Sequence, residues 1–248
     1  MVMIPYNWEQ PPAYAETGAE RLIQNLAHAP EDAILADETT HVALMSYGGR
    51  TFVMRKPGRH INDVDPHMLL RRRAAALIVG LGNAALEHLV AYSPEQETIA
   101  TDYVSSPTLD TLPTAIVEQI DEDHYKGLLD TIEWMSSHNL QPDTGHPDNY
   151  LFTLDGFFLI DYSGVDPNGP TAGEHPATTY LKFLAMMIDY VGVSDDPAYK
   201  QAWLQSCHKG LDVVRQRYPG AGEGLTPGLD WLRDLIRIVD EDLGSEPT

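Results

Sequence analysis

The sequence predicts an α+β fold in which a β-rich N-terminal part is followed by a mainly helical C-terminal part. Short β-rich runs separated by turn residues dominate residues 33–55, and amphipathic helical patterns dominate residues 177–243. A second β-rich stretch, residues 150–160, lies between the two parts and follows a loop rich in carboxylates. Strands and helices that are segregated along a chain are typical of the α+β class.

The N-terminal strands are predicted from residue type and turn chemistry. The runs at residues 33–36, 41–46 and 51–55 are rich in β-branched and apolar side chains. Gly48 and Gly49 separate the last two runs, and glycines tolerate the positive φ angles of a tight hairpin turn. We therefore expect an antiparallel sheet in this part of the chain.

The helices are predicted from apolar residues that recur every three or four positions. The first such segment covers residues 16–29, and a longer one covers residues 66–90, with a proline that suits the first turn of a helix. Residues 111–139 have the pattern of a helical core. The remaining amphipathic helices are expected over residues 177–191, 197–218 and 229–243.

The composition argues against several classes of function. The 248 residues carry a formal net charge of −21, which disfavours binding to nucleic acid or to an anionic membrane. No secretory signal is visible, and the longest apolar-rich stretch, residues 74–86, is too short to cross a bilayer. The single cysteine, Cys207, excludes an internal disulfide and fits a reducing compartment. We expect a soluble cytoplasmic protein.

The strongest functional signal lies in residues 140–164. Two short apolar runs, residues 150–153 and 157–160, are separated by Leu-Asp-Gly, and an Asp-Gly pair between β-rich runs predicts a hairpin. Asn149 then stands just before the first strand, and Asp161 stands just after the second. Two oxygen ligands at the open end of a hairpin can hold a hard cation such as Mg²⁺.

A resemblance to a known family rests on HPDNYLF at residues 146–152 and LIDY at residues 159–162. These segments are similar to the catalytic segment of the kinase-like phosphotransferases, in the aminoglycoside phosphotransferase and choline kinase branch. In that branch an HGD-x-x-x-x-N loop is followed by a hairpin and an Ile-Asp-aromatic segment. TFVMRKPG at residues 51–58 resembles the Y-V-L-R-x-P-G strand of the same group. The chain is interpreted as a divergent member of this superfamily.

The resemblance implies a protein-kinase-like fold with two lobes. The N-lobe would cover residues 1–104 and contain an N-terminal arm, an antiparallel sheet and a long helix. The C-lobe would cover residues 105–248, would be mainly helical, and would carry the catalytic-type loop and the hairpin. The ligand site would then lie between the lobes.

The resemblance also implies an ATP- and Mg²⁺-dependent phosphotransferase that acts on a small hydroxyl-bearing substrate. Asn149 and Asp161 would hold the metal. Arg55 takes the place of the residue that holds the nucleotide phosphates, and Lys56 points to the opposite face, so only one of the two can serve. Asp102 lies in ETIATDYV, which resembles the hinge whose backbone meets adenine.

The catalytic base is open between two carboxylates. A match to the family loop without a gap places Thr144 at the catalytic Asp, and Asp143 falls one residue early. A one-residue bulge would bring Asp143 into place to orient the acceptor hydroxyl, and otherwise Asp143 caps a turn after Pro142. Asp148, next to Asn149, is the second candidate.

Three departures from the family pattern support an alternative, a catalytically inactive pseudokinase that serves as a binding or regulatory module with a protein partner. Residues 37–41, where the phosphate-covering loop is expected, carry carboxylates instead of glycine. No acid stands where the helix over residues 66–90 should supply one, and residues 71–73 are arginines that either face solvent or meet an anionic ligand or a partner. Thr144 at the base position is the third departure.

Other chemistries lack a signal in the sequence. The ten histidines show no zinc-binding spacing, and neither a nucleophile elbow nor a P-loop is present. A coincidental match in some other α+β protein remains the third possibility.

Overall fold

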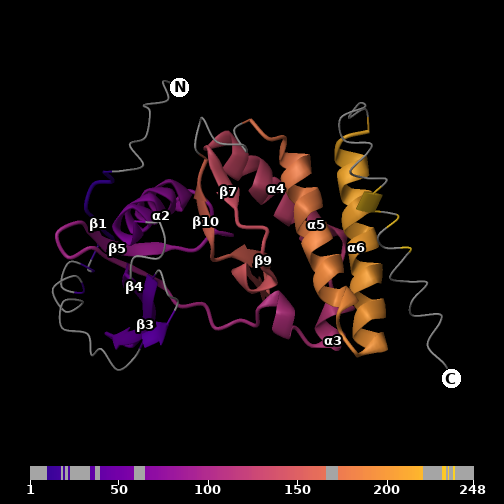
Figure 1. The fold of residues 1–248 in the computed structure, drawn as a ribbon, viewed down its shortest axis with the longest axis horizontal. Coiled ribbons are helices and arrows are strands. Elements are labelled where there is room, and N and C mark those ends of the chain that lie inside the picture. Colours follow the sequence, from indigo (N-terminus) through magenta and orange to yellow (C-terminus); the bar gives the residue numbers. More distant parts are fainter. Residues whose placement is uncertain are drawn as a thin grey trace. The chain divides into compact units, whose positions relative to one another are not determined.

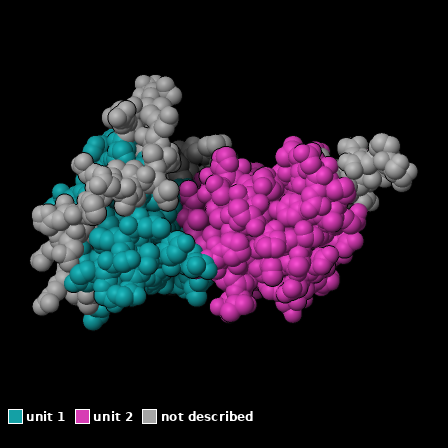
Figure 2. Space-filling view, turned by 90° about the horizontal axis from the view of Figure 1, so that it is seen from below, with its two compact units in different colours: residues 1–105, 162–164 teal, residues 106–161, 165–248 magenta. Residues whose placement is uncertain are grey.

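The computed structural model describes residues 10–17, 19, 22, 34–36, 40–58, 65–165, 173–219, 231, 232, 234 and 237 (Figure 1). The chain divides into two compact units, shown in separate colours in Figure 2. Unit 1 comprises residues 1–105 and 162–164, and unit 2 comprises residues 106–161 and 165–248. Unit 1 is built on an antiparallel sheet and unit 2 is mainly helical, so the predicted α+β class is confirmed. The assignment of these units as kinase lobes stays a prediction.

Unit 1 contains a six-stranded antiparallel sheet in the order β1-β5-β6-β4-β3-β2. Its strands are β1 (Tyr14–Ala15), β2 (Ile34–Ala36), β3 (Thr40–Tyr47), β4 (Arg50–Pro57), β5 (Leu89–Ser93) and β6 (Thr98–Asp102). The β3–β4 hairpin turns at Gly48 and Gly49, whose φ angles of 59° and 80° are the left-handed values of a two-residue hairpin turn. The hairpin predicted from these glycines is confirmed.

Strand β4 divides its side chains between the two faces of the sheet. Phe52 and Met54 are buried in an apolar core that also contains Ala100 of β6. Arg55 occupies the alternate position, and successive side chains of a strand point to opposite faces, so Arg55 points away from this core. Helix α2 (Pro66–Gly80) packs on β4, β5 and β6.

The prediction of a single helix over residues 66–90 is wrong beyond residue 80. The chain turns there, because the Asn83 N–H donates to the Gly80 carbonyl at 3.0 Å and the Asn83 side chain accepts the Ala85 N–H at 2.9 Å. Asparagine offers the backbone such alternatives to a helix, and glycine has low helix propensity. The apolar residues that follow form the fully buried strand β5, which periodicity alone cannot distinguish from a buried helix.

The described part of unit 2 is built on helices α4 (Glu122–Ser137), α5 (Pro176–Gly192) and α6 (Pro197–Arg217), which pack against one another. The shorter elements are η2 (Leu109–Thr111), α3 (Thr114–Val117), β7 (Leu140–Pro142), η3 (Pro147–Asn149), β8 (Tyr150–Thr153) and β9 (Gly156–Leu159). The helices predicted over residues 177–191 and 197–218 are confirmed. Those predicted over residues 16–29 and 229–243 lie largely outside the described residues.

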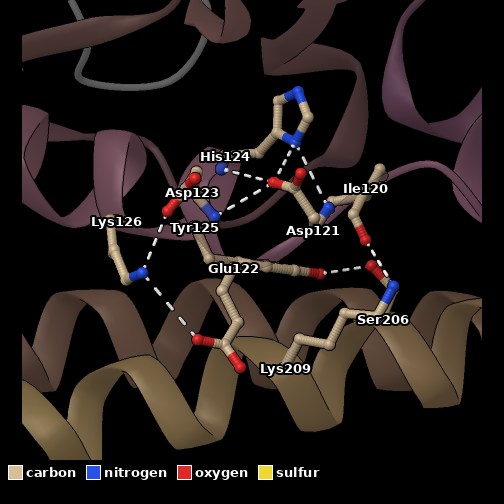
Figure 3. A network of polar contacts seen from close by, with 9 residues as sticks. All are labelled: Ile120, Asp121, Glu122, Asp123, His124, Tyr125, Lys126, Ser206 and Lys209. Carbon is tan, nitrogen blue, oxygen red and sulfur yellow. Dashed lines mark hydrogen bonds and ion pairs between the residues drawn. The ribbon is translucent and has the colours of Figure 1, made fainter.

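The N-terminus of α4 is fixed by a capping box and by contacts with α6 (Figure 3). Asp121 Oδ1 accepts the His124 N–H at 3.1 Å, and the His124 ring accepts the Asp121 N–H at 3.2 Å. The Tyr125 hydroxyl lies 2.9 Å from Ser206 Oγ, and Lys209 donates to the carbonyl that precedes Asp121. The bonds to Ser206 and Lys209 tie the N-terminus of α4 to α6.

The β8–β9 hairpin predicted from the Leu-Asp-Gly sequence is confirmed. Thr153 pairs with Gly156, whose φ angle of 110° is one that glycine adopts without strain. Phe157 packs against Tyr125 of α4 and Phe183 of α5, with ring centroids 5.4 and 5.6 Å away. This aromatic contact holds the hairpin on the helices.

The helices of the described ranges are too short or too polar to span a lipid bilayer.

Candidate functional site

The loop before β8 and the end of β9 bring three of the predicted site residues together in unit 2. The Asp143 N–H donates to the Asp161 carbonyl at 3.2 Å. The Ile160 N–H donates to the Asn149 carbonyl at 3.0 Å, next to the Tyr150–Leu159 pair of the hairpin. Asn149 and Asp161 therefore flank one end of the hairpin, and Asp143 lies beside them. Their roles as metal ligands and base stay predictions.

The two candidate bases differ in how they are held. Asp143 is exposed, and its Oδ1 accepts the Gly145 N–H at 2.8 Å, which forms the side-chain turn expected after Pro142. Asp148 is exposed on the short helix η3, and its side chain forms no hydrogen bond or ion pair with the described residues. Of the two, Asp143 is joined to Asp161 by a backbone hydrogen bond, and the choice of base between Asp143 and Asp148 stays a prediction.

The oxygen donors of Asp143, Asn149 and Asp161 suit a hard cation that keeps part of its coordination shell for other ligands. Within the described residues, no group of three or more His, Cys, Asp or Glu side chains is gathered as a metal site. The edge of unit 2 offers instead the carboxylates of Asp143 and Asp161 and the amide of Asn149. Mg²⁺ usually binds through one or two carboxylates and retains water or substrate phosphate, so this set is chemically sufficient.

Tyr150 adds an unusual feature to this edge. The residue follows Asn149 directly, is fully buried, and has a hydroxyl without a hydrogen-bond partner. Burial, together with the charges of Asp143 and Asp161, raises the pKa of Tyr150 above its usual value, so the phenol is protonated at neutral pH. A buried hydroxyl without a partner is uncommon in folded proteins and calls for a physical explanation. The sequence analysis treated Tyr150 only as the start of a strand.

A pocket of about 660 Å³ lies in unit 2 beside the same loop. Thr144 and His146 line it from the loop, Leu181 and Asp189 line it from α5, and Trp231 closes it from the C-terminal part of the chain. The volume falls in the range of small-molecule sites. The sequence could not reveal this pocket, because its walls come from segments that lie far apart in the chain.

Unit 1 contains a buried ion cluster around Glu87. Arg55 Nη1 lies 2.7 Å from Glu87 Oε1, and Arg73 Nη2 lies 2.9 Å from Glu87 Oε2. The Thr101 hydroxyl donates to Glu87 Oε1 at 2.7 Å and accepts from Arg55 Nη1 at 3.0 Å. Burial opposes the ionisation of Glu87, but the two guanidinium groups prevail and hold the pKa of this carboxyl below its usual value.

Glu87 is the acid that the sequence analysis missed. An acid to pair with Arg55 was expected on the helix, near residues 71–73, but it comes from the segment between α2 and β5. Arg73 meets this acid inside unit 1, whereas Arg71 is exposed and pairs with Glu97 at 3.1 Å. The signal that could have found Glu87 is its place beside the apolar residues of β5, because a buried carboxylate there needs a cationic partner.

The other predicted nucleotide-binding residues also lie in unit 1. Lys56 pairs with His41 of β3 in the sheet register, and it projects to the face opposite Arg55. Asp102 ends β6, and its carboxylate accepts from Arg50 Nη2 at 2.7 Å. Of the predicted phosphate-covering loop, residues 37–39 lie outside the described residues, and residues 40 and 41 begin β3.

Comparison with known proteins finds similarity to solved structures but no match among family models or curated proteins. Among solved structures, the chain is similar to the Rio2 kinase–ADP/Mg²⁺–phosphoaspartate complex from Chaetomium thermophilum. The sequence identity is 13%, the TM-score is 0.47, and the match covers 92% of this chain and 78% of the other. The narrower resemblance to the aminoglycoside phosphotransferase and choline kinase branch is not confirmed by these comparisons.

Proposed function

We propose that the chain is a kinase-like phosphotransferase that transfers a phosphoryl group from ATP to a hydroxyl of a small molecule, with Mg²⁺ as the metal cofactor. The observation that carries this proposal is the placement of Asp143, Asn149 and Asp161 at one edge of unit 2 by two backbone hydrogen bonds. Phosphoryl transfer requires mainly positioning and charge neutralisation, supplied by a metal and by a carboxylate that orients the nucleophile. The motif around residues 146–152 supports the same reading.

Each residue has a defined role in this proposal. Asn149 and Asp161 hold the cation, which when bound neutralises charge on the phosphates. The Asp143 carboxylate orients the acceptor hydroxyl and takes its proton as the new oxygen–phosphorus bond forms and the bond to the ADP oxygen breaks. The Gly145 N–H fixes one oxygen of Asp143, so the orientation of the carboxylate is set by the loop.

The acceptor is proposed to bind in the pocket of unit 2. Residues 144–147, which line one wall of the pocket, follow Asp143 directly in the chain. A small molecule in the pocket therefore lies beside the loop that carries the proposed base. The cytoplasmic location expected from the single cysteine is retained as part of the proposal.

A thermal-shift titration with ATP and Mg²⁺ tests the proposal. Ligand that binds only the native state raises its stability by about 2.7 kcal/mol at 100 times the Kd, so the wild type should melt at higher temperature. Asp161→Ala should abolish the shift. Asp155→Ala, which changes an exposed aspartate at the opposite end of the same hairpin, should retain it. Absence of any shift in the wild type at millimolar nucleotide would reject the phosphotransferase.

A pseudokinase is the second candidate, and one observation favours it. Arg55 is only 9% exposed and already bonds to Glu87 and Thr101, so little of its guanidinium is available to a phosphate. Such a protein would keep a binding or regulatory role with a protein partner and lack turnover. Nucleotide binding without release of ADP over a panel of small alcohols, in the presence of Mg²⁺, would favour this candidate over the enzyme.

A further inference from the structure

The hydroxyl of Tyr150 differs from those of three other buried tyrosines in this protein. Tyr125, Tyr162 and Tyr180 place their hydroxyls 2.9 Å from Ser206 Oγ, 3.0 Å from the Glu87 carbonyl and 3.1 Å from the Gly210 carbonyl, respectively. The Tyr150 hydroxyl has no such partner, although the residue is 0% exposed. A buried donor left unpaired costs about 1–3 kcal/mol, and buried tyrosines usually find a partner.

Packing alone does not require this hydroxyl. The ring of Tyr150 stacks at a tilt on Phe183 of α5, with centroids 4.8 Å apart, and a phenylalanine would make the same contact. Tyr150 lies between Asn149 and Leu151 at the start of β8, so its backbone is fixed at the edge that carries the proposed ligands. The Asp143 N–H donates to the Asp161 carbonyl at 3.2 Å and the Ile160 N–H donates to the Asn149 carbonyl at 3.0 Å, so both acids lie at this same edge.

We propose that Tyr150 is a positioning residue for the cation site, and that its hydroxyl donates a hydrogen bond to the Asp161 carboxylate when a divalent cation draws that side chain into its coordination. The inference rests on the proposed function, because it assumes that the cation binds at this edge. Groups that hydrogen-bond to metal ligands fix the orientation of those ligands, and their loss typically costs about 10–100-fold in metal affinity. The buried Tyr150 hydroxyl, which has no hydrogen-bond partner, can thus gain one when the cation binds.

Tyr150→Phe tests this role with two measurements that should move in opposite directions. In calorimetric titrations with Mn²⁺, with and without ADP, the variant should bind the cation about 10–100-fold more weakly than the wild type. In urea unfolding without cation, the variant should be as stable as the wild type or more stable, because an unpaired buried hydroxyl has been removed. If the hydroxyl had only a structural role, its removal would not weaken cation binding.

Tyr180→Phe is the matched control, since Tyr180 is also fully buried in unit 2 but bonds to the Gly210 carbonyl. This variant should lose stability and keep the wild-type affinity for Mn²⁺. Asp161→Asn should lose cation binding without the tyrosine being changed, and it reports on the proposed function itself.

The outcomes separate the two proposals. If the wild type binds Mn²⁺, Asp161→Asn does not, and Tyr150→Phe binds as the wild type does, then the role of Tyr150 is wrong and the cation site stands. If Tyr150→Phe loses as much stability as Tyr180→Phe, the hydroxyl is already bonded without the cation, and the inference is again overturned. If the wild type binds neither Mn²⁺ nor Mn²⁺ with ADP, both proposals fall.

Discussion

Two regions of the molecule contain carboxylates in opposite environments. One is the buried ion cluster around Glu87 in unit 1, and the other is the edge of unit 2 that carries Asp143 and Asp148. Glu87 is 3% exposed, and it meets two guanidinium groups and a hydroxyl within its own unit. Asp143 and Asp148 are exposed, and the Asp143 carboxylate accepts the Gly145 N–H of its own loop. A buried charge must be paired where it lies, whereas an exposed carboxylate keeps its hydration until a ligand replaces it. Glu87 therefore belongs to the fold, and the acids of unit 2 are available for function.

Loss of Glu87 should have the largest effect on stability. Glu87→Ala leaves Arg55 and Arg73 without their shared carboxylate, and breaking a buried ion pair costs about 3–5 kcal/mol. The free energy of unfolding in urea measures this cost. Glu118→Ala, at an exposed glutamate, should change the same quantity by less than about 0.5 kcal/mol. Equal effects of the two substitutions would remove the contrast between buried and exposed acids.

Loss of the proposed base should affect turnover and spare stability. Asp143→Asn should lower kcat for phosphoryl transfer by about 10²–10⁴, the usual contribution of a positioned general base. The asparagine retains an oxygen to accept the Gly145 N–H, so urea unfolding should be unchanged. Asp148→Asn should keep kcat within a few-fold of the wild type. The reverse pattern would assign the base to Asp148.

Two helical glycines offer a comparison of packing in the two units. A Cβ on Gly80 of α2 would overlap the Tyr162 hydroxyl, which donates to the Glu87 carbonyl at 3.0 Å, so Gly80→Ala should cost about 1–3 kcal/mol. Gly127 of α4 is exposed with open space around it, so Gly127→Ala should stabilise by about 0.5–1 kcal/mol. If Gly80→Ala and Gly127→Ala shifted the melting temperature in the same direction, the expected difference between the two sites would be contradicted.

The smallest expected effect is a pH dependence that originates in unit 1. The pKa of Glu87 is lower in the folded chain than in the unfolded chain, where glutamate titrates near about 4.3. Its stabilising contribution is therefore complete above about pH 4.3 and is lost as the pH falls through the folded value. Glu87→Gln should make the decline of unfolding free energy in this acidic window shallower than in the wild type. An unchanged slope would show that Glu87 is not the group that titrates.

Local patterns predicted the hairpins, since their signals lie in adjacent residues. Gly48 and Gly49 determine the β3–β4 turn, and the Leu-Asp-Gly sequence determines the β8–β9 turn through the positive φ of Gly156. The helix over residues 66–90 was predicted too long, because the buried strand β5 has no polar face to reveal its period.

The candidate site was predicted in part for the same reason. Asn149 and Asp161 follow from the hairpin, since strand pairing fixes which residues flank its open end. The place of Asp143 beside Asp161 could not be predicted, because it depends on a backbone hydrogen bond between residues eighteen positions apart in the chain. The partner of Arg55 was missed because the acid was expected on the helix, whereas Glu87 lies in the segment after α2 and reaches Arg55 only in the folded chain.

The sequence by itself thus determined the α+β class, the two turns and the pair of residues at the end of the hairpin. Only the tertiary structure decided that Arg55 is buried against Glu87, that Asp143 lies beside Asp161, and that the Tyr150 hydroxyl has no partner. The physical reason is that turns depend on the φ angles of neighbouring residues, whereas burial and charge pairing depend on which distant segments meet.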